Sequence, residues 1–176
     1  MVVPRVSYLH AGPILRLCSP AADALGLTHL LHSRYATKAN LVAYAAHPAH
    51  VAAVQVHIIS KALDTTTVDW VNTAESPSTV GAGVAVRLTL ARVNDGVEVR
   101  HVVEKVAKAS KDAGVARVSF AENFSSARDK GYGFMMVAVF DNMEELDAVE
   151  GGSNVEEAKA ALSPMLDEVM VLDFVV

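Results

Sequence analysis

The side chains best suited to chemistry gather in one short segment, Tyr-Ala-Ala-His-Pro-Ala-His at residues 44–50. A histidine that titrates near neutral pH can remove a proton from carbon, and a tyrosine hydroxyl can polarise a carbonyl group. His29, on an earlier stretch, is a further candidate for the same site. Six of the seven histidines lie between residues 10 and 57. We therefore expect the chemistry to be concentrated in the first part of the chain.

Each of these side chains also has a purely structural interpretation. Pro48 cannot continue a helix from the preceding turn, so His47 could cap the helix break. His50 could be bonded to a backbone carbonyl, Tyr44 could lie at the edge of the core, and His29 could be buried in a strand. A metal would need ligands beyond His47 and His50. We expect neither a metal nor a cofactor.

The elements that position these residues are a strand and a helix broken near its middle. Residues 28–35 are of β type, and alternation places His29 and His32 on opposite faces of the strand. We expect one helix from about 38 to 46 and a second from 48 to about 63. The second should turn an apolar stripe towards the core, formed by Val51, Val54, Ile58 and Ala62. The remaining histidines of this region are expected at the surface: His10, His32 and His57.

The chain repeats itself, and the offset is nearly constant from residue 28 onward. Three pairs of segments match: 6–8 with 118–120, 28–35 with 133–140 (an offset of 105 positions), and 68–71 with 172–175 (an offset of 104). We therefore predict two related units, residues 1–73 and 84–176. Residues 74–83, rich in serine, proline and glycine, are predicted to link them.

The second unit has the complete β-α-β-β-α-β order of a ferredoxin-like split βαβ domain. Its expected elements are 86–93, 99–110, 118–124, 133–140, 143–168 with a break at 151–152, and 169–175. The first unit lacks the counterpart of roughly residues 84–112, a strand and a helix. Its last strand, around 66–72, is thereby left without an obvious neighbour. Either the sequence is shortened here, or another segment or chain fills the gap.

The two units differ in chemistry at equivalent positions. At an offset of 105, each polar candidate of the first unit meets an apolar residue or glycine in the second: His29 meets Phe134, Tyr44 meets Val149, His47 meets Gly152 and His50 meets Val155. A purely architectural role would allow either chemistry in both units. The difference predicts one functional cavity, in the first unit.

Composition narrows the classes of function. The apolar share is 52% and the charged share 20%, as in globular proteins. A net charge of −5 with scattered basic residues argues against nucleic acid or acidic membranes as partners. The single cysteine, Cys18, excludes a disulfide within one chain and favours a reducing compartment. With no long apolar window and no signal-like start, we expect an intracellular protein, cytoplasmic or chloroplast if a transit peptide has been removed.

Residues 44–50, preceded by Thr28-His29-Leu30 and followed by Val68-Asp69-Trp70, resemble the stress-responsive dimeric α/β-barrel family in its tandem plant form. The resemblance implies an α+β fold in which two ferredoxin-like units pack as a barrel, here as an internal pseudo-dimer with possible further homo-oligomers. In a polyketide cyclase branch of that family, a tyrosine and a histidine of this segment act as an acid–base pair. By resemblance these would be Tyr44 and His50, with His29 and His47 lining the ligand site and no cofactor required.

Two functions remain open on this basis. The first is a stress-response protein whose first unit binds a hydrophobic small molecule. The second is a cofactor-free cyclase that closes a ring by an intramolecular aldol-type reaction through Tyr44 and His50. The cyclase requires both side chains to face one enclosed cavity of roughly 300 Å³ or more.

Overall fold

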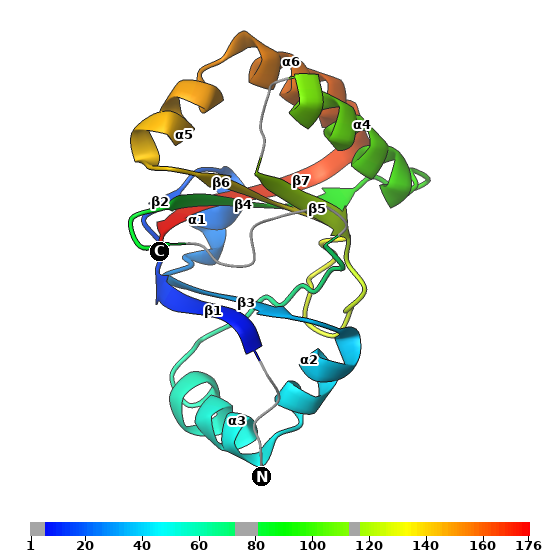
Figure 1. The fold of residues 1–176 in the computed structure, drawn as a ribbon. Coiled ribbons are helices and arrows are strands. Elements are labelled where there is room, and N and C mark those ends of the chain that lie inside the picture. Colours follow the sequence, from blue (N-terminus) through cyan, green and yellow to red (C-terminus); the bar gives the residue numbers. More distant parts are fainter. Residues whose placement is uncertain (1–5, 73–80, 113–116) are drawn as a thin grey trace.

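The computed structural model describes residues 6–72, 81–112 and 117–176, and it stacks them in four layers (Figure 1). Helices cover the outer side of a five-stranded sheet, a two-stranded sheet faces its inner side, and further helices lie beyond the small sheet. The predicted plan of two split βαβ units, the first without its first strand and helix, is confirmed.

The second unit forms the larger sheet and most of the core. Its elements are β4 (Ala85–Val93), α4 (Val99–Asp112), β5 (Val118–Glu122), β6 (Phe134–Phe140), α5 (Met143–Glu150), α6 (Ser153–Leu162), a 3-10 turn (Ser163–Met165) and β7 (Leu166–Val175). The antiparallel strands run in the order β2-β7-β4-β6-β5. The helix α4 is amphipathic, and it buries Val102 and Val106 against the outer face of the sheet.

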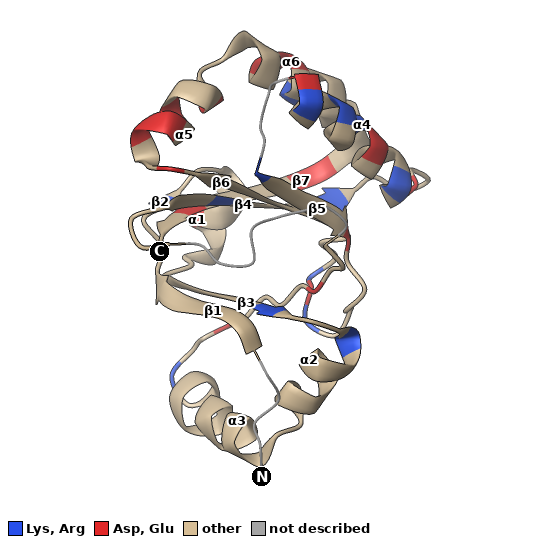
Figure 2. Ribbon diagram, in the orientation of Figure 1, with Lys and Arg blue, Asp and Glu red and all other residues tan. Residues whose placement is uncertain are grey.

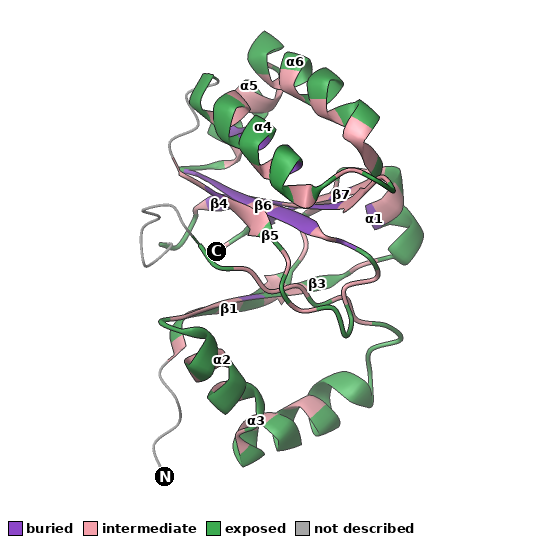
Figure 3. Cartoon of the chain, turned by 90° about the vertical axis from the view of Figure 1, so that its right-hand side faces the viewer, coloured by how far each residue is buried: buried purple, intermediate pink, exposed green. Residues whose placement is uncertain are grey.

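The first unit contributes smaller elements. They are β1 (Val6–Pro13), β2 (Arg16–Leu17), α1 (Pro20–Leu25), β3 (His29–Tyr35), α2 (Lys38–Ala45), α3 (Pro48–Ala53) and a π-helical segment (Val54–Ile59). The strands β1 and β3 pair antiparallel, while β2 joins the edge of the larger sheet beside β7. Ser19 and Thr37 cap α1 and α2 with their hydroxyl oxygens. In both views α2 and α3 lie on the side of the small sheet that faces away from the large one (Figures 1 and 3).

The units are related by matching contacts, in which each unit binds the last segment of the other. The backbone N–H of Leu15 donates to Asp173 O at 2.8 Å, and that of Phe124 donates to Asp69 O at 2.9 Å. Asp69 and Asp173 are the equivalent residues of the repeat. Each unit therefore holds the last segment of the other, which is the arrangement of a pseudo-dimer within one chain.

The core lies between the two sheets (Figure 3). Buried apolar side chains of β4, β6 and β7 form its upper wall: Val86, Leu88, Leu90, Met135, Val137, Val139, Met170, Leu172 and Phe174. Tyr8 and Leu30 from the small sheet, and Trp70 from the segment that follows, pack against this wall. Burial of this apolar surface is the main stabilising contribution to the barrel.

Two details of the first unit differ from expectation. Residues 68–71 form no regular strand; they run beside the end of β5, where Asp69 N donates to Asn123 Oδ1 at 3.1 Å. With no described strand on its other side, this segment is hydrogen-bonded along one edge only. The helix after Pro48 becomes π-helical and ends at Ile59, and Val51 and Ile58 of the expected core stripe are exposed. The stripe is exposed because no described helix packs opposite it. Residues 74–80 of the predicted linker lie outside the described residues, and the boundaries of the units stay predictions.

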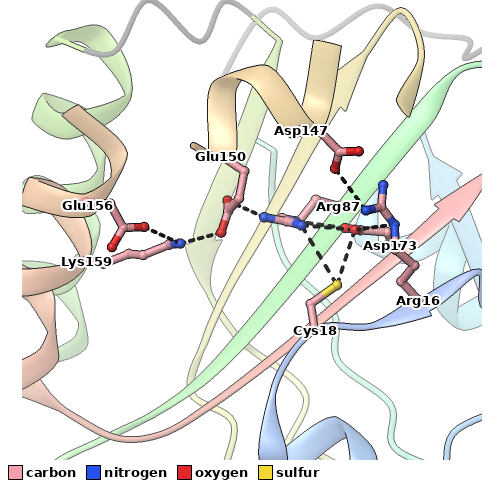
Figure 4. Close-up of polar contacts among 8 residues, drawn as sticks. All are labelled: Arg16, Cys18, Arg87, Asp147, Glu150, Glu156, Lys159 and Asp173. Atoms are coloured by element: carbon pink, nitrogen blue, oxygen red, sulfur yellow. Dashed lines mark hydrogen bonds and ion pairs between the residues drawn. The ribbon is translucent and has the colours of Figure 1, made fainter. Parts of the chain in front are cut away.

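A buried ion pair of the second unit lies on the outer face of the large sheet, beneath α5, and two residues of the first unit reach it (Figure 4). Asp173 is fully buried, and Arg87 donates to both of its carboxylate oxygens, with Nε–Oδ1 at 2.8 Å and a terminal nitrogen to Oδ2 at 3.0 Å. From the first unit, the Cys18 thiol donates to Asp173 Oδ2 at 3.3 Å, and Arg16 Nε lies 3.6 Å from the same oxygen. Burial, followed by the bond to Asp173, raises the pKa of the Cys18 thiol. The thiol is therefore a hydrogen-bond donor rather than a nucleophile.

Candidate functional site

The polar side chains that point into the barrel come from β1 and β3. In the register of this pair, His10 lies opposite His32 and Tyr8 lies opposite Arg34. Because side chains alternate along a strand, all four share the face that looks towards the large sheet. The guanidinium carbon of Arg34 lies 5.6 Å from the centre of the Tyr8 ring. We call Tyr8, His10, His32 and Arg34 the inner cluster.

Aromatic rings from both units surround the inner cluster. The His10 ring stacks on Phe174 with centroids 5.6 Å apart and planes at 18°. The His32 ring is parallel to Trp70 within 11° at 6.2 Å, and it meets Tyr8 edge-on at 5.2 Å. These contacts give a flat, apolar lining from which only the polar ring atoms can form hydrogen bonds.

Three polar atoms of the inner cluster are buried and have no hydrogen-bond partner within the described residues: Tyr8 Oη, His10 Nε2 and His32 Nδ1. Buried polar groups are almost always paired, and an unpaired one costs about 1–3 kcal/mol. Gly12 leaves room for the His10 ring, since a Cβ at that position would lie 3.0 Å from His10 Nε2. Such a set of atoms, close together and facing one interior, is suited to a bound molecule that carries hydrogen-bonding groups.

Electrostatics decide the charge state of the cluster. Burial, followed by the nearby positive charges of Arg34 and His10, lowers the pKa of His32 to about 4. Burial raises the pKa of the Tyr8 phenol, and Arg34 opposes that shift. At neutral pH, His32 is uncharged and Tyr8 is protonated. The pair can donate and accept hydrogen bonds, but His32 is a weak base for removing a proton from carbon.

The second unit has no comparable cluster at the equivalent positions. His32 corresponds to Val137, which is 2% exposed. His10 pairs with His32, and Ser119 pairs with Val137, so Ser119 is the residue equivalent to His10. The offset between them is 109 positions, whereas the matching segments 6–8 and 118–120 predict 112. The Ser119 hydroxyl accepts from Trp70 Nε1 at 2.9 Å and donates to Asn72 Oδ1 at 2.8 Å. At these positions the second unit has either a hydrogen-bonded polar group, on Ser119, or an apolar side chain, Val137. The first unit has polar groups without described partners.

The structure brings Tyr44 and His50 together, but on the outer helix layer. Their ring centroids are 4.4 Å apart, and His50 Nδ1 lies 3.1 Å from Ala45 O. A carbonyl oxygen only accepts, so Nδ1 carries the proton and Nε2 is the free acceptor. The Tyr35 ring, from β3, packs on the sheet side of this pair, with its centroid 5.3 Å from that of Tyr44.

His47 and His29 are placed apart from this pair. His47 caps α3, with Ala49 N donating to His47 Nδ1 at 3.2 Å, which matches its structural interpretation. His29 is exposed on the outer face of β3, and its Nδ1 lies 3.0 Å from the hydroxyl of Thr28. The four predicted site residues therefore do not share one location.

The prediction that His32 lies at the surface is wrong, since its side chain is only 7% exposed. His10, also expected at the surface, is half-buried. The alternation along the strand correctly placed His29 and His32 on opposite faces. It did not predict which of the two faces turns inward. The repeat contained a signal for a polar site at His32. At the offset of 105 that was applied to His29, His32 is equivalent to an apolar residue, Val137.

Two depressions on the described surface lie elsewhere. One of about 410 Å³ is lined by residues of α4 and by Met165, and one of about 190 Å³ lies between α5 and α6. Neither touches Tyr44 or His50. Among the described residues, no group of three or more His, Cys, Asp or Glu side chains is arranged to hold a metal. No helix in the described parts is both long and apolar enough to cross a membrane.

Comparison with known proteins identifies the family. The model of the stress responsive A/B barrel domain matches residues 3–72 and again 85–176. The chain belongs to the stress-responsive A/B barrel domain family. It holds two copies of the domain, in agreement with the repeat, and the predicted resemblance is confirmed.

Two relatives from Arabidopsis thaliana share this domain, and both are described as stress-response A/B barrel domain-containing proteins. The first is 33% identical over 179 residues, which cover 98% of this chain and 66% of the relative. The second is 31% identical over 174 residues, covering 97% of this chain and 80% of the relative. The chain thus spans slightly less than two thirds of the length of the first relative.

Solved structures resemble the whole arrangement of two units. One is a protein of Fusobacterium nucleatum that is proposed to be a monooxygenase. It aligns with 96% of this chain over 74% of its own length, at a TM-score of 0.66 and 11% identity. A second, from Lactobacillus acidophilus, aligns with 95% of this chain over 75% of its own length, at a TM-score of 0.57 and 17% identity. At such low identity the likeness shows the fold alone.

Proposed function

We propose that this stress-responsive A/B barrel protein binds a small, largely apolar molecule at the inner cluster of its first unit. The observation that carries the proposal is the set of three buried polar atoms without partners among the described residues, on Tyr8, His10 and His32. A molecule with a hydroxyl or carbonyl group would pair with them, and its apolar body would contact the rings of Trp70 and Phe174.

The charge state of the site narrows the ligand class. His32 is neutral at physiological pH, and Tyr8 keeps its proton, so neither provides a charge of its own to the ligand. A neutral phenol or a short neutral polyketide can exchange hydrogen bonds with both side chains and stack on the aromatic lining. Where it meets His32 and Tyr8, the ligand is therefore expected to present a neutral hydroxyl or carbonyl group on an aromatic or conjugated body.

A thermal-shift screen with phenols and short polyketides tests this function. A ligand present at about 100 times its Kd should stabilise the folded protein by about 2.7 kcal/mol. Tyr8→Phe and His32→Val each remove one hydrogen-bonding partner, which should weaken binding by about tenfold. His101→Gln, at an exposed position of α4, is the matched control and should bind like the wild type. Equal affinity for all four proteins would contradict binding at the inner cluster.

The contact between Tyr44 and His50 favours a second candidate, a cofactor-free aldol-type cyclase. Neither described depression touches the pair, so this candidate requires a cavity of roughly 300 Å³ to form beside it when the substrate binds. His50 Nε2 is a free acceptor because Nδ1 is bonded to Ala45 O, so it could act as a base beside the Tyr44 hydroxyl. If this function holds, Tyr44→Phe and His50→Gln should each lower the rate of ring closure of a linear polyketide by about 100-fold. His57→Gln, at an exposed position beyond α3, is the control. Ring closure at the uncatalysed rate by the wild type would end this candidate.

A further inference from the structure

The last segment of the first unit, residues 66–72, is held in place by the second unit. The backbone N–H of Phe124 donates to Asp69 O at 2.9 Å, and Asp69 N donates to Asn123 Oδ1 at 3.1 Å. These two bonds fix the path of the backbone beside the end of β5. They do not fix the side-chain torsions of Trp70, the next residue, which forms part of the aromatic lining of the inner cluster.

The orientation of the Trp70 ring is set by a hydrogen bond to Ser119 of the second unit. Trp70 Nε1 donates to the Ser119 hydroxyl at 2.9 Å, and that hydroxyl donates in turn to Asn72 Oδ1 at 2.8 Å. The N–H is the only polar group of an indole ring, so this bond is the one polar contact that can select its rotation. Ser119 is 4% exposed, and little water can compete for the bond.

In this orientation Trp70 turns the flat face of its ring towards His32, with the planes within 11° and the centroids 6.2 Å apart. Because its N–H is bonded to Ser119, Trp70 presents only an apolar ring face to the site. The surroundings are weakly charged, since β1 carries no charged residue and β3 carries only Arg34 (Figure 2). A wall that is already ordered avoids the entropy cost of ordering it when a ligand stacks on it.

The repeat contains the same pair of positions a second time. Phe174 is equivalent to Trp70 at the offset of 104, and His10 is equivalent to Ser119. Phe174 stacks on His10 with centroids 5.6 Å apart, whereas Trp70 is hydrogen-bonded to Ser119. The His10 ring keeps a buried Nε2 without a partner among the described residues, but the polar groups of Trp70 and Ser119 are paired. One half is thus open to a ligand, and the other is fixed.

We propose that Ser119 of the second unit is a positioning residue for the ligand site of the first unit. Its hydroxyl holds the Trp70 indole parallel to His32, and it thereby preforms the aromatic wall on which the ligand stacks. The inference rests on the proposed function, because it concerns the same site. It makes binding depend on both units, although the polar atoms that face the ligand come from the first.

A spectrum of the protein without ligand tests the positioning itself. Trp70 is the single tryptophan of the chain, so the long-wavelength edge of the near-UV circular dichroism spectrum reports its orientation alone. Ser119→Ala should lose most of this band, while the far-UV spectrum stays that of the folded protein. Ser119→Thr keeps the hydroxyl and should retain the band, as should Ser7→Ala, at an exposed position of β1. An unchanged band in Ser119→Ala would overturn the proposal.

Calorimetric titration with β-naphthol, a flat neutral phenol, tests the effect on binding. Ser119→Ala should raise the Kd by about fivefold to tenfold, and Ser119→Thr should bind like the wild type. In a Trp70→Phe background, Ser119→Ala should cause no further loss, because the indole N–H is already absent. An equal loss in both backgrounds would overturn the proposal.

Two further outcomes separate this inference from the proposed function. Binding that is weakened by Tyr8→Phe but unchanged by Ser119→Ala would retain the inner cluster as the ligand site and overturn the role of Ser119. A wild type that does not bind β-naphthol would count against the proposed function, and with it against a role of Ser119 in binding. The spectral comparison would still decide whether Ser119 orients Trp70.

Discussion

The Arg87→Met variant is expected to lose about 3–5 kcal/mol of folding free energy, because it leaves the carboxylate of Asp173 buried without its main partner. Asp173 has no exposed surface, and the side chain of Arg87 is 11% exposed, so water cannot replace the lost contacts. Arg16 and Cys18 remain near the carboxylate, at 3.6 and 3.3 Å, and they offset only part of the loss. Urea denaturation followed by circular dichroism measures the difference.

Two control variants show whether the buried charge is the cause. The double variant Arg87→Met with Asp173→Leu removes both charges and should regain most of the lost stability. Arg117→Met breaks the pair with Asp141, whose side chain is 76% exposed, and should cost less than about 1 kcal/mol. If Arg87→Met were as mild as Arg117→Met, the ion pair would not be a major contribution to the stability of the fold.

The second large effect is a loss of stability between pH 6.5 and pH 4 caused by His32. In the unfolded chain this histidine takes up a proton near pH 6.5, whereas in the folded protein its pKa is about 4. Between these values the unfolded state binds more protons, so the free energy of unfolding falls as the pH is lowered. The loss begins as the pH drops through 6.5 and reaches about 3 kcal/mol near pH 4.

The His32→Val variant should remove this part of the pH dependence, because valine occupies the equivalent position, Val137, in the second unit. At pH 5 the wild type should have lost about 2 kcal/mol more than the variant, relative to pH 7. The neighbouring residues Arg34 and His10 remain in both proteins. His101→Gln, on the exposed side of α4, should retain the full dependence. Parallel stability curves for wild type and His32→Val would show that His32 is protonated equally easily in both states.

The pH effect also links stability to the proposed function. A proton on His32 turns both ring nitrogens into donors and adds a charge within an apolar lining. An uncharged ligand that donates a hydrogen bond to His32 should therefore bind more weakly at pH 4 than at pH 7. Loss of binding and loss of stability would then have the same physical cause.

Local sequence pattern was sufficient for the repeat, the order of the elements and the alternation along β3. These features depend on near neighbours: apolar spacing defines each helix and strand, and Pro48 ends one helix and begins the next. The role of His47 as a cap follows from the same local rule. The family could be inferred for the same reason, because residues 44–50 and the doubled pattern lie within short stretches of chain.

Only the packing of the two units decided where the polar side chains lie. Alternation shows that His29 and His32 point in opposite directions, but the inward direction is set by the large sheet, four of whose five strands come from residues more than 50 positions away. The same packing places residues 66–72 beside the end of β5, where Asp69 N donates to Asn123 Oδ1. The interior of a barrel is formed by contacts distant in sequence, so its side chains and their pKa values depend on the tertiary structure.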